Sequence, residues 1–177
     1  MKTKIFCDIA DYKTIKFFNS KSFVDGFTTN PSLMRLAGAK NYKNYSLKIL
    51  RICKNKPISF EVFADNPKDM LKQAYEINSW GKNVYVKIPV VNSRGIFTGS
   101  VIKELSDKGI KLNITAVYTF EQTKKIYKRL NKKTKSIISI FAGRMADKGK
   151  DPLPIFKRSI SLVKRNKNIE ILWASTR

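Results

Sequence analysis

The sequence predicts an α/β fold built on a parallel β-sheet. Seven short runs rich in β-branched and aromatic residues alternate with longer segments whose apolar residues follow helical spacing. Such alternation is typical of β-α units, in which each helix carries the chain back to start the next parallel strand. Hydrophobic residues make up 42% of the 177 residues, enough for a sizeable core, so we expect one domain over residues 1–177.

Each element has a local reason in the sequence. Asn66-Pro67 and Asp151-Pro152 supply helix-starting residues, Thr119 begins a capping-box pattern, and Gly109 follows a segment where a helix should end. The predicted helices lie near residues 11–18, 32–54, 67–80, 99–108, 119–131 and 152–166. The predicted strands are Lys4–Asp8, Phe23–Phe27, Ile58–Phe63, Asn83–Ile88, Lys111–Ala116, Ser136–Phe141 and Ile169–Ala174.

Two arrangements of such a sheet are possible: an open doubly wound sheet or a (β/α)8 barrel. The first connection begins Asp8-Ile9-Ala10-Asp11 and has no glycine-rich phosphate loop, which disfavours a dinucleotide-binding doubly wound sheet. A barrel needs eight strands, whereas seven are visible and the chain stops at Arg177. Either the last β/α unit is missing or the strand count is too low.

Composition excludes several kinds of chemistry. The chain has no histidine, which rules out Ser-His, Cys-His and His-metal mechanisms, and no metal-ligand spacing surrounds Cys7 or Cys53. No apolar run has the length of a membrane span, and the first residues do not resemble a signal peptide. We therefore expect a cytoplasmic protein with no membrane partner.

The net charge of +23 suggests anionic partners. However, 28 of the 36 basic residues are lysines spread along the whole chain, and no nucleic-acid motif is present. We interpret most of this charge as solvated surface, with attraction of an anionic small substrate as a compatible reading. A basic protein that binds nucleic acid remains an alternative.

Polar residues interrupt several strands that should be apolar on both faces. Because side chains alternate across a strand, Lys87 points away from Val86 and Ile88. By the same rule Asp8, Glu61 and Thr115 oppose the apolar residues of their own strands. Each could be a strand end that reaches water, but in a barrel these faces converge at the carboxyl ends of the strands, where such enzymes place their chemistry.

Lys87 is the candidate nucleophile. Enclosure in a strand face lowers the pKa of an amine by desolvation, while nearby carboxylates raise it. A neutral amine can attack a carbonyl and form a Schiff base, and without histidine the proton transfers fall to groups such as Asp8 and Glu61. The plainer alternative is an ion pair between Lys87 and Glu61, which would itself be costly to bury.

The residues match a known family across nearly the whole chain. The sequence resembles the small transaldolases and the related fructose-6-phosphate aldolases. The segments that carry the resemblance are Phe6-Cys7-Asp8-Ile9-Ala10, Val24–Leu33 with its Thr-Thr-Asn-Pro-Ser motif, Ser59–Val62, Val86-Lys87-Ile88-Pro89-Val90, Asn113–Tyr118, Phe141-Ala142-Gly143-Arg144 and Trp173–Arg177. Asp8 is followed by Ile9, where relatives commonly have Thr or Ser.

The resemblance implies a (β/α)8 TIM barrel of the class I aldolase type. It implies that Lys87 forms the Schiff base, Asp8 handles the proton of the cleaved hydroxyl, and Glu61 and Thr115 hold a relay water. It further implies that Asn30 and Ser175 bind the dihydroxyacetone part of a phosphorylated sugar. Arg144 and Arg177 would bind its phosphate, without metal or organic cofactor.

The resemblance also favours a transaldolase of the non-oxidative pentose phosphate pathway. In this family Phe at position 141 and Glu at position 61 accompany transfer of dihydroxyacetone from sedoheptulose 7-phosphate or fructose 6-phosphate, whereas the aldolases carry Tyr and Gln. Release of free dihydroxyacetone and an inactive fragment remain alternatives. Small relatives form decamers through a terminal helix, so a homo-oligomer is expected only if that helix is present.

Overall fold

The strands of the protein form one parallel sheet in sequence order. A computed structural model describes residues 3–176, and its seven strands pair from the first to the seventh without a reversal. A doubly wound sheet would reverse its order, so this topology confirms the barrel type of α/β fold. The strands are β1 (Phe6–Asp8), β2 (Gly26–Thr28), β3 (Ile58–Glu61), β4 (Val84–Pro89), β5 (Leu112–Val117), β6 (Ser136–Ile140) and β7 (Ile169–Trp173).

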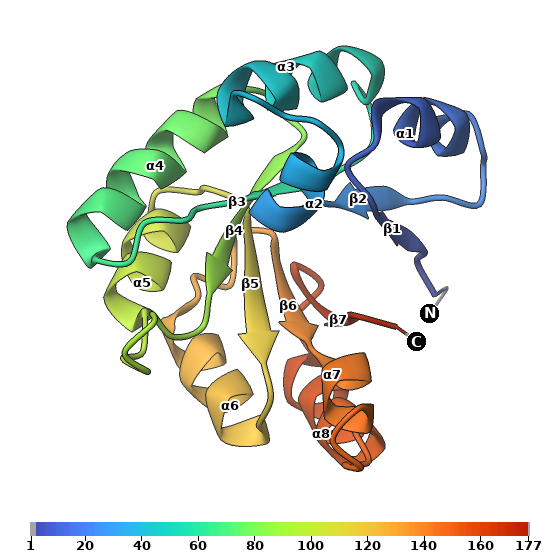
Figure 1. The fold of residues 1–177 in the computed structure, drawn as a ribbon. Coiled ribbons are helices and arrows are strands. Elements are labelled where there is room, and N and C mark those ends of the chain that lie inside the picture. The colour runs from blue at the N-terminus through green and yellow to red at the C-terminus, as the bar shows by residue number, and fades with distance from the viewer. Residues whose placement is uncertain (1–2, 177) are drawn as a thin grey trace.

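The longer helices lie on the outside of the curved sheet (Figure 1). The helices succeed one another around the sheet in sequence order, as the colours from blue to red show. The two ends of the described chain lie on the same side of the molecule. The helices are α1 (Tyr12–Asn19), α2 (Pro31–Leu36), α3 (Tyr42–Ile52), α4 (Pro67–Ser79), α5 (Gly99–Asp107), α6 (Phe120–Arg129), α7 (Ala142–Ala146) and α8 (Leu153–Val163). No helix in residues 3–176 is both long and apolar enough to cross a bilayer.

One predicted helix is wrong and one helix was not predicted. The segment 32–54 forms two helices, because Gly38 adopts a left-handed φ of 84° after α2 and the side chain of Asn41 then caps α3. The five-residue helix α7 follows β6 directly, and it is too short to show an apolar period. Strand β2 begins at Gly26, later than the predicted Phe23, whose side chain is exposed.

The core lies between the sheet and the helices. Val84, Val86 and Ile88 of β4 are fully buried on the outward face of the sheet, as their alternation predicts. The inward face at the carboxyl ends is instead lined by polar side chains, described below. The fold therefore keeps its hydrophobic layer outside the sheet and leaves the inside available for chemistry.

Strands β1 and β7 are the two edges of the sheet. No ladder of backbone hydrogen bonds joins them within residues 3–176. An ion pair between Lys4 Nζ and Glu170 Oε1, 2.5 Å apart, connects the two edges near their amino-terminal ends.

The capping box at the start of α6 provides a test of the local energetics. The Thr119 side chain accepts from the backbone N–H of Gln122, and the Gln122 side chain accepts from the N–H of Thr119. We expect Thr119→Ala to lower the free energy of unfolding by about 1 kcal/mol, because orphan helix donors lose their acceptor. Urea denaturation should show this loss, and Thr119→Ser should restore most of it. Equal stability of the Ala and Ser variants would contradict the assignment.

Candidate active site

The strand register places the central residues in one row. Glu61 of β3 is paired with Lys87 of β4, and Lys87 is paired with Asn113 of β5. Thr115 lies two residues further along β5, on the same face as Asn113. At the sheet edge Asp8 of β1 is paired with Thr28 of β2. The neighbouring strands β1 to β5 therefore all present polar side chains near their carboxyl ends.

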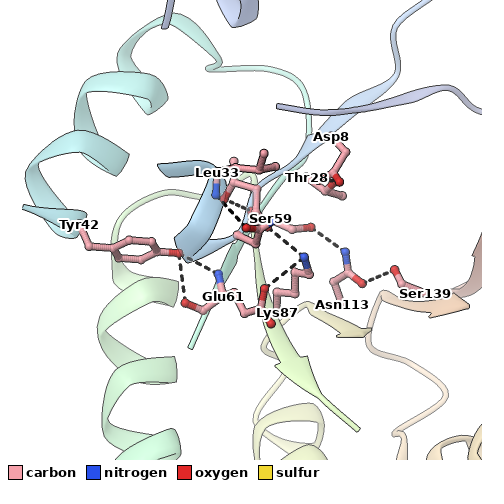
Figure 2. A network of polar contacts seen from close by, with 11 residues as sticks. Asp8, Thr28, Leu33, Tyr42, Ser59, Glu61, Lys87, Asn113 and Ser139 are labelled. Atoms are coloured by element: carbon pink, nitrogen blue, oxygen red, sulfur yellow. Dashed lines mark hydrogen bonds and ion pairs between the residues drawn. The ribbon is translucent and has the colours of Figure 1, made fainter. Parts of the chain in front are cut away.

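Lys87 is the most enclosed charged side chain of this row. It is 6% exposed, and its Nζ lies 3.2 Å from Glu61 Oε2 and donates to the Thr29 carbonyl oxygen at 3.0 Å. Figure 2 shows the lysine and glutamate side chains converging inside the sheet. The ion pair considered from the sequence is therefore present, and a carbonyl oxygen also holds the amine in place.

Glu61 carries a perturbed carboxyl group. Burial raises its pKa, the nearby Lys87 lowers it in part, and the charge of Asp8 raises it further. A raised pKa makes a carboxylate a better proton acceptor, which suits a general acid-base group.

Tyr42 of α3 holds the backbone of Glu61 in position. Its hydroxyl donates to the Glu61 carbonyl oxygen at 3.1 Å and accepts from the Glu61 N–H at 2.9 Å (Figure 2). The Tyr42 ring packs edge-on against Phe63 and is tilted against Trp80. Burial, as the main cause, raises the pKa of this phenol, so Tyr42 stays neutral and can both donate and accept.

Asp8 is oriented by its neighbour on β2. The Thr28 hydroxyl donates to Asp8 Oδ1 at 2.7 Å, and the carboxylate is otherwise exposed to the interior opening. A single strong hydrogen bond fixes the carboxylate while leaving its other lone pairs available to a ligand.

Thr115 has a buried hydroxyl without a partner. The residue is 1% exposed, and its Oγ1 makes no hydrogen bond with any atom of residues 3–176. Just beyond it, β5 has a bulge between Ile114 and Val117, where Ala116 adopts a left-handed φ of 59°. A buried hydroxyl normally finds a partner, so this one indicates a place for a water molecule or a ligand atom. Bulges are frequent beside active sites.

A chain of hydrogen bonds crosses the inner face of the sheet, and the sequence did not predict it. Asn113 Nδ2 donates to Ser59 Oγ at 2.9 Å, and Ser139 Oγ donates to Asn113 Oδ1 at 2.7 Å (Figure 2). All three residues are buried. Alternation along β5 places Asn113 on the same face as Thr115, but nothing local in the sequence shows that Asn113 contacts Ser59 and Ser139.

The predicted site residues meet in one cavity of about 750 Å³ at the carboxyl ends of the strands. Its lining includes eight of the nine residues selected from the sequence. Arg177, the ninth, lies outside the described residues. The eight are Asp8, Asn30, Glu61, Lys87, Thr115, Phe141, Arg144 and Ser175.

Four of the five predicted binding residues lie in described segments that follow strands. Asn30 uses its side-chain oxygen to cap α2 at Leu33 N, 2.9 Å away, which leaves its amide N–H groups for a ligand. Phe141 packs edge-on against Tyr118, and Arg144 of α7 is exposed at the cavity. Ser175 adopts a left-handed φ of 60° after β7.

The fold and this cavity define a class of protein: a (β/α)-barrel chain with a buried lysine-carboxylate pair at the carboxyl ends of its strands. Among residues 3–176, no group of three His, Cys, Asp or Glu side chains is placed to hold a metal ion. Comparison with known proteins gives the family. The chain matches the family model described as transaldolase/fructose-6-phosphate aldolase over residues 5–177, and it belongs to that family.

Curated proteins that are similar to this chain support the same family. A protein named probable transaldolase from Herpetosiphon aurantiacus is 34% identical over 176 residues, which cover 98% of this chain and 75% of the relative. A protein of the same name from Methanococcus maripaludis is 37% identical over 150 residues, covering 84% of this chain and 64% of that protein.

A solved structure supports the fold alone. A protein of the dihydrodipicolinate synthase family from Coccidioides immitis superposes with a TM-score of 0.64 at 12% identity. The match covers 95% of this chain and 59% of that one, so the chain spans less than two thirds of this structural neighbour.

The Lys87–Glu61 pair predicts a pH-dependent stability. Lys87→Met removes the cation that lowers the pKa of Glu61, so this pKa in the folded state should rise further above its unfolded value. The unfolded chain then binds fewer protons between the two values, and stability falls as the pH rises through that window. We expect the free energy of unfolding of the variant to fall as the pH rises above 4.5, the ordinary pKa of a glutamate carboxyl.

The matched control for this measurement is Lys87→Met/Glu61→Gln, which lacks the titrating carboxyl but retains every other ionisable group. Urea denaturation of both variants across the pH range isolates the contribution of Glu61. Parallel stability curves for the two variants would show that the folded-state pKa of Glu61 is not raised in Lys87→Met, and would contradict the prediction.

Proposed function

We propose that this protein is a transaldolase that transfers a dihydroxyacetone unit between phosphorylated sugars through a Schiff base on Lys87. The observation that carries the proposal is the buried Lys87 Nζ, 3.2 Å from a carboxylate of raised pKa, within a cavity of about 750 Å³. Membership of the transaldolase/fructose-6-phosphate aldolase family supports it. Sedoheptulose 7-phosphate or fructose 6-phosphate is the proposed donor, and an aldose phosphate the acceptor.

Formation of the Schiff base begins with proton transfer. The Lys87 ammonium passes a proton to Glu61, and the neutral amine attacks C2 of the ketose. The carbinolamine that results loses its hydroxyl as water, with the proton supplied through Glu61. The unpartnered Thr115 Oγ1 is placed to hold the water that relays these protons.

Cleavage then uses Asp8 as the base. Asp8 takes the proton of the C4 hydroxyl, and the C3–C4 bond breaks. The electron pair of that bond moves into the protonated Schiff base and forms an enamine. The aldose phosphate leaves, and the enamine attacks the carbonyl carbon of a second aldose phosphate in the reverse sequence. The hydrogen bond from Thr28 keeps the Asp8 carboxylate oriented for both transfers.

The rest of the cavity binds the substrate. Asn30 and Ser175 are proposed to hold the dihydroxyacetone hydroxyls, and Arg144 with Arg177 the phosphate, since guanidinium groups match phosphate oxygens in geometry. Because the lysine supplies the electron sink, the proposed reaction needs neither metal nor organic cofactor. We place this reaction in the cytoplasm and in the non-oxidative pentose phosphate pathway.

Phe141 favours transfer over release. The enamine is released as free dihydroxyacetone only if its carbon is protonated, and the phenyl ring that Phe141 places at the cavity has no proton to give. A second candidate function, fructose-6-phosphate aldolase, is thereby less well supported, although it belongs to the same family.

Transfer can be measured directly with fructose 6-phosphate and erythrose 4-phosphate as donor and acceptor. We expect sedoheptulose 7-phosphate and glyceraldehyde 3-phosphate to form in equal amounts. Lys87→Met should abolish the reaction, and Glu61→Gln should slow it by roughly 10²–10⁴-fold, because proton transfer loses its acceptor. Lys128→Met, on the outer surface of α6, is the matched control and should retain activity.

Phe141→Tyr should shift the reaction toward release. The new hydroxyl can protonate the enamine, so we expect free dihydroxyacetone, measured with no acceptor present, to rise by about tenfold or more. Phe141→Leu adds no proton donor and should leave release at the wild-type level. Equal release by the Tyr and Leu variants would contradict the role given to this side chain.

A further inference from the structure

A second cavity lies at the opposite end of the strands. Its volume is about 390 Å³, and it is lined by residues at or just before the amino-terminal ends of the strands. Phe6 is the one residue that also lines the cavity of Lys87. The charged residues of this lower cavity are Lys4, Asp25, Lys82, Lys111, Lys135 and Glu170.

The positive charges of the lower cavity are only partly compensated. Glu170 pairs with Lys4 at 2.5 Å, and Asp25 accepts from the backbone N–H of Ile5 at 2.8 Å. Within the described chain, Lys82, Lys111 and Lys135 form no ion pair. Three lysines from the starts of β4, β5 and β6 therefore share one concave space without a carboxylate partner.

Lys111 is held in place at the wall of this cavity. Its Nζ donates to the Lys82 carbonyl oxygen and lies 5.5 Å from the centre of the Tyr85 ring. Burial lowers the pKa of Lys111, and the charge of Lys135 lowers it further. Both effects disfavour the charged amine, and a bound anion would relieve them.

The shape of the cavity favours a small ligand. Its volume falls within the range of small-molecule sites, and Tyr85 and Asn55 add polar groups beside the lysines. Lysine binds phosphate as a point charge, which suits an anion of compact shape. A nucleic-acid backbone fits less well, because Asp25 and Glu170 line the same cavity and would repel a continuous row of phosphates.

We propose that the lower cavity is a second anion-binding site, which takes a small phosphate-bearing ligand between Lys82, Lys111 and Lys135. It is separate from the proposed catalytic cavity and does not depend on the function proposed for Lys87. The ligand could be an inorganic polyphosphate or a phosphomonoester, which share the group that the lysines bind.

The test is a titration of the whole chain with inorganic pyrophosphate, and separately with fructose 6-phosphate, followed by backbone amide chemical shifts. We expect saturable shifts at Asn83, Tyr85 and Lys111, and the tighter ligand identifies the source of the phosphate. Lys111→Gln/Lys135→Gln should weaken binding at these amides by about tenfold or more. Lys135→Gln alone, at an exposed side chain, should weaken it several-fold without disturbing the fold.

The matched control is Lys72→Gln/Lys128→Gln, which removes the same charge from exposed positions on α4 and α6. It should change affinity by less than about twofold. Equal weakening by this control, shifts confined to the residues around Arg144, or no saturation would overturn the proposal. Tighter binding of a short DNA duplex at the same amides would replace it with a nucleic-acid surface. Lys87→Met should leave the lower-cavity shifts intact whether or not the enzyme is active.

Discussion

The burial of Lys87 is the constraint on which the rest of the site depends. An isolated ammonium inside a protein costs several kcal/mol, so the fold must supply a counter-charge and acceptors at close range. Glu61 provides the charge from the adjacent strand, and the Thr29 carbonyl accepts a hydrogen bond. The register of β3 with β4 makes this possible, because a slip of one residue would turn Glu61 to the opposite face.

Positioning of the site extends from this pair to the helices outside the sheet. Tyr42 bonds both backbone groups of Glu61, so α3 fixes the backbone that carries this carboxylate. On the inner side, Ser59, Asn113 and Ser139 satisfy one another across three strands. Thr115 is the exception, and its unsatisfied hydroxyl marks the point where the protein leaves room for a ligand or water. Among residues 3–176, Thr115 is therefore the cavity residue with a buried side-chain polar atom that lacks a partner.

Sequence periodicity predicted much of this arrangement. Alternation within β4 correctly separated the buried valines from Lys87, and the same rule turned Asp8, Glu61 and Thr115 inward. It did not show the break at Gly38, the short α7, or the hydrogen bonds from Tyr42, since these depend on a local φ or on contacts between distant segments. The grouping of the lysines in the lower cavity was not predicted for the same reason. These lysines are far apart in the chain, and only the parallel topology brings them together.

The Schiff base proposed for Lys87 can be tested by reductive trapping with fructose 6-phosphate and borohydride, read by intact mass and peptide mapping. A Schiff base on Lys87 predicts one added mass per chain, on the peptide that contains Lys87, and none in Lys87→Met. An adduct on another lysine, or no adduct from a chain that unfolds cooperatively, would contradict the central role given to the buried Lys87–Glu61 pair.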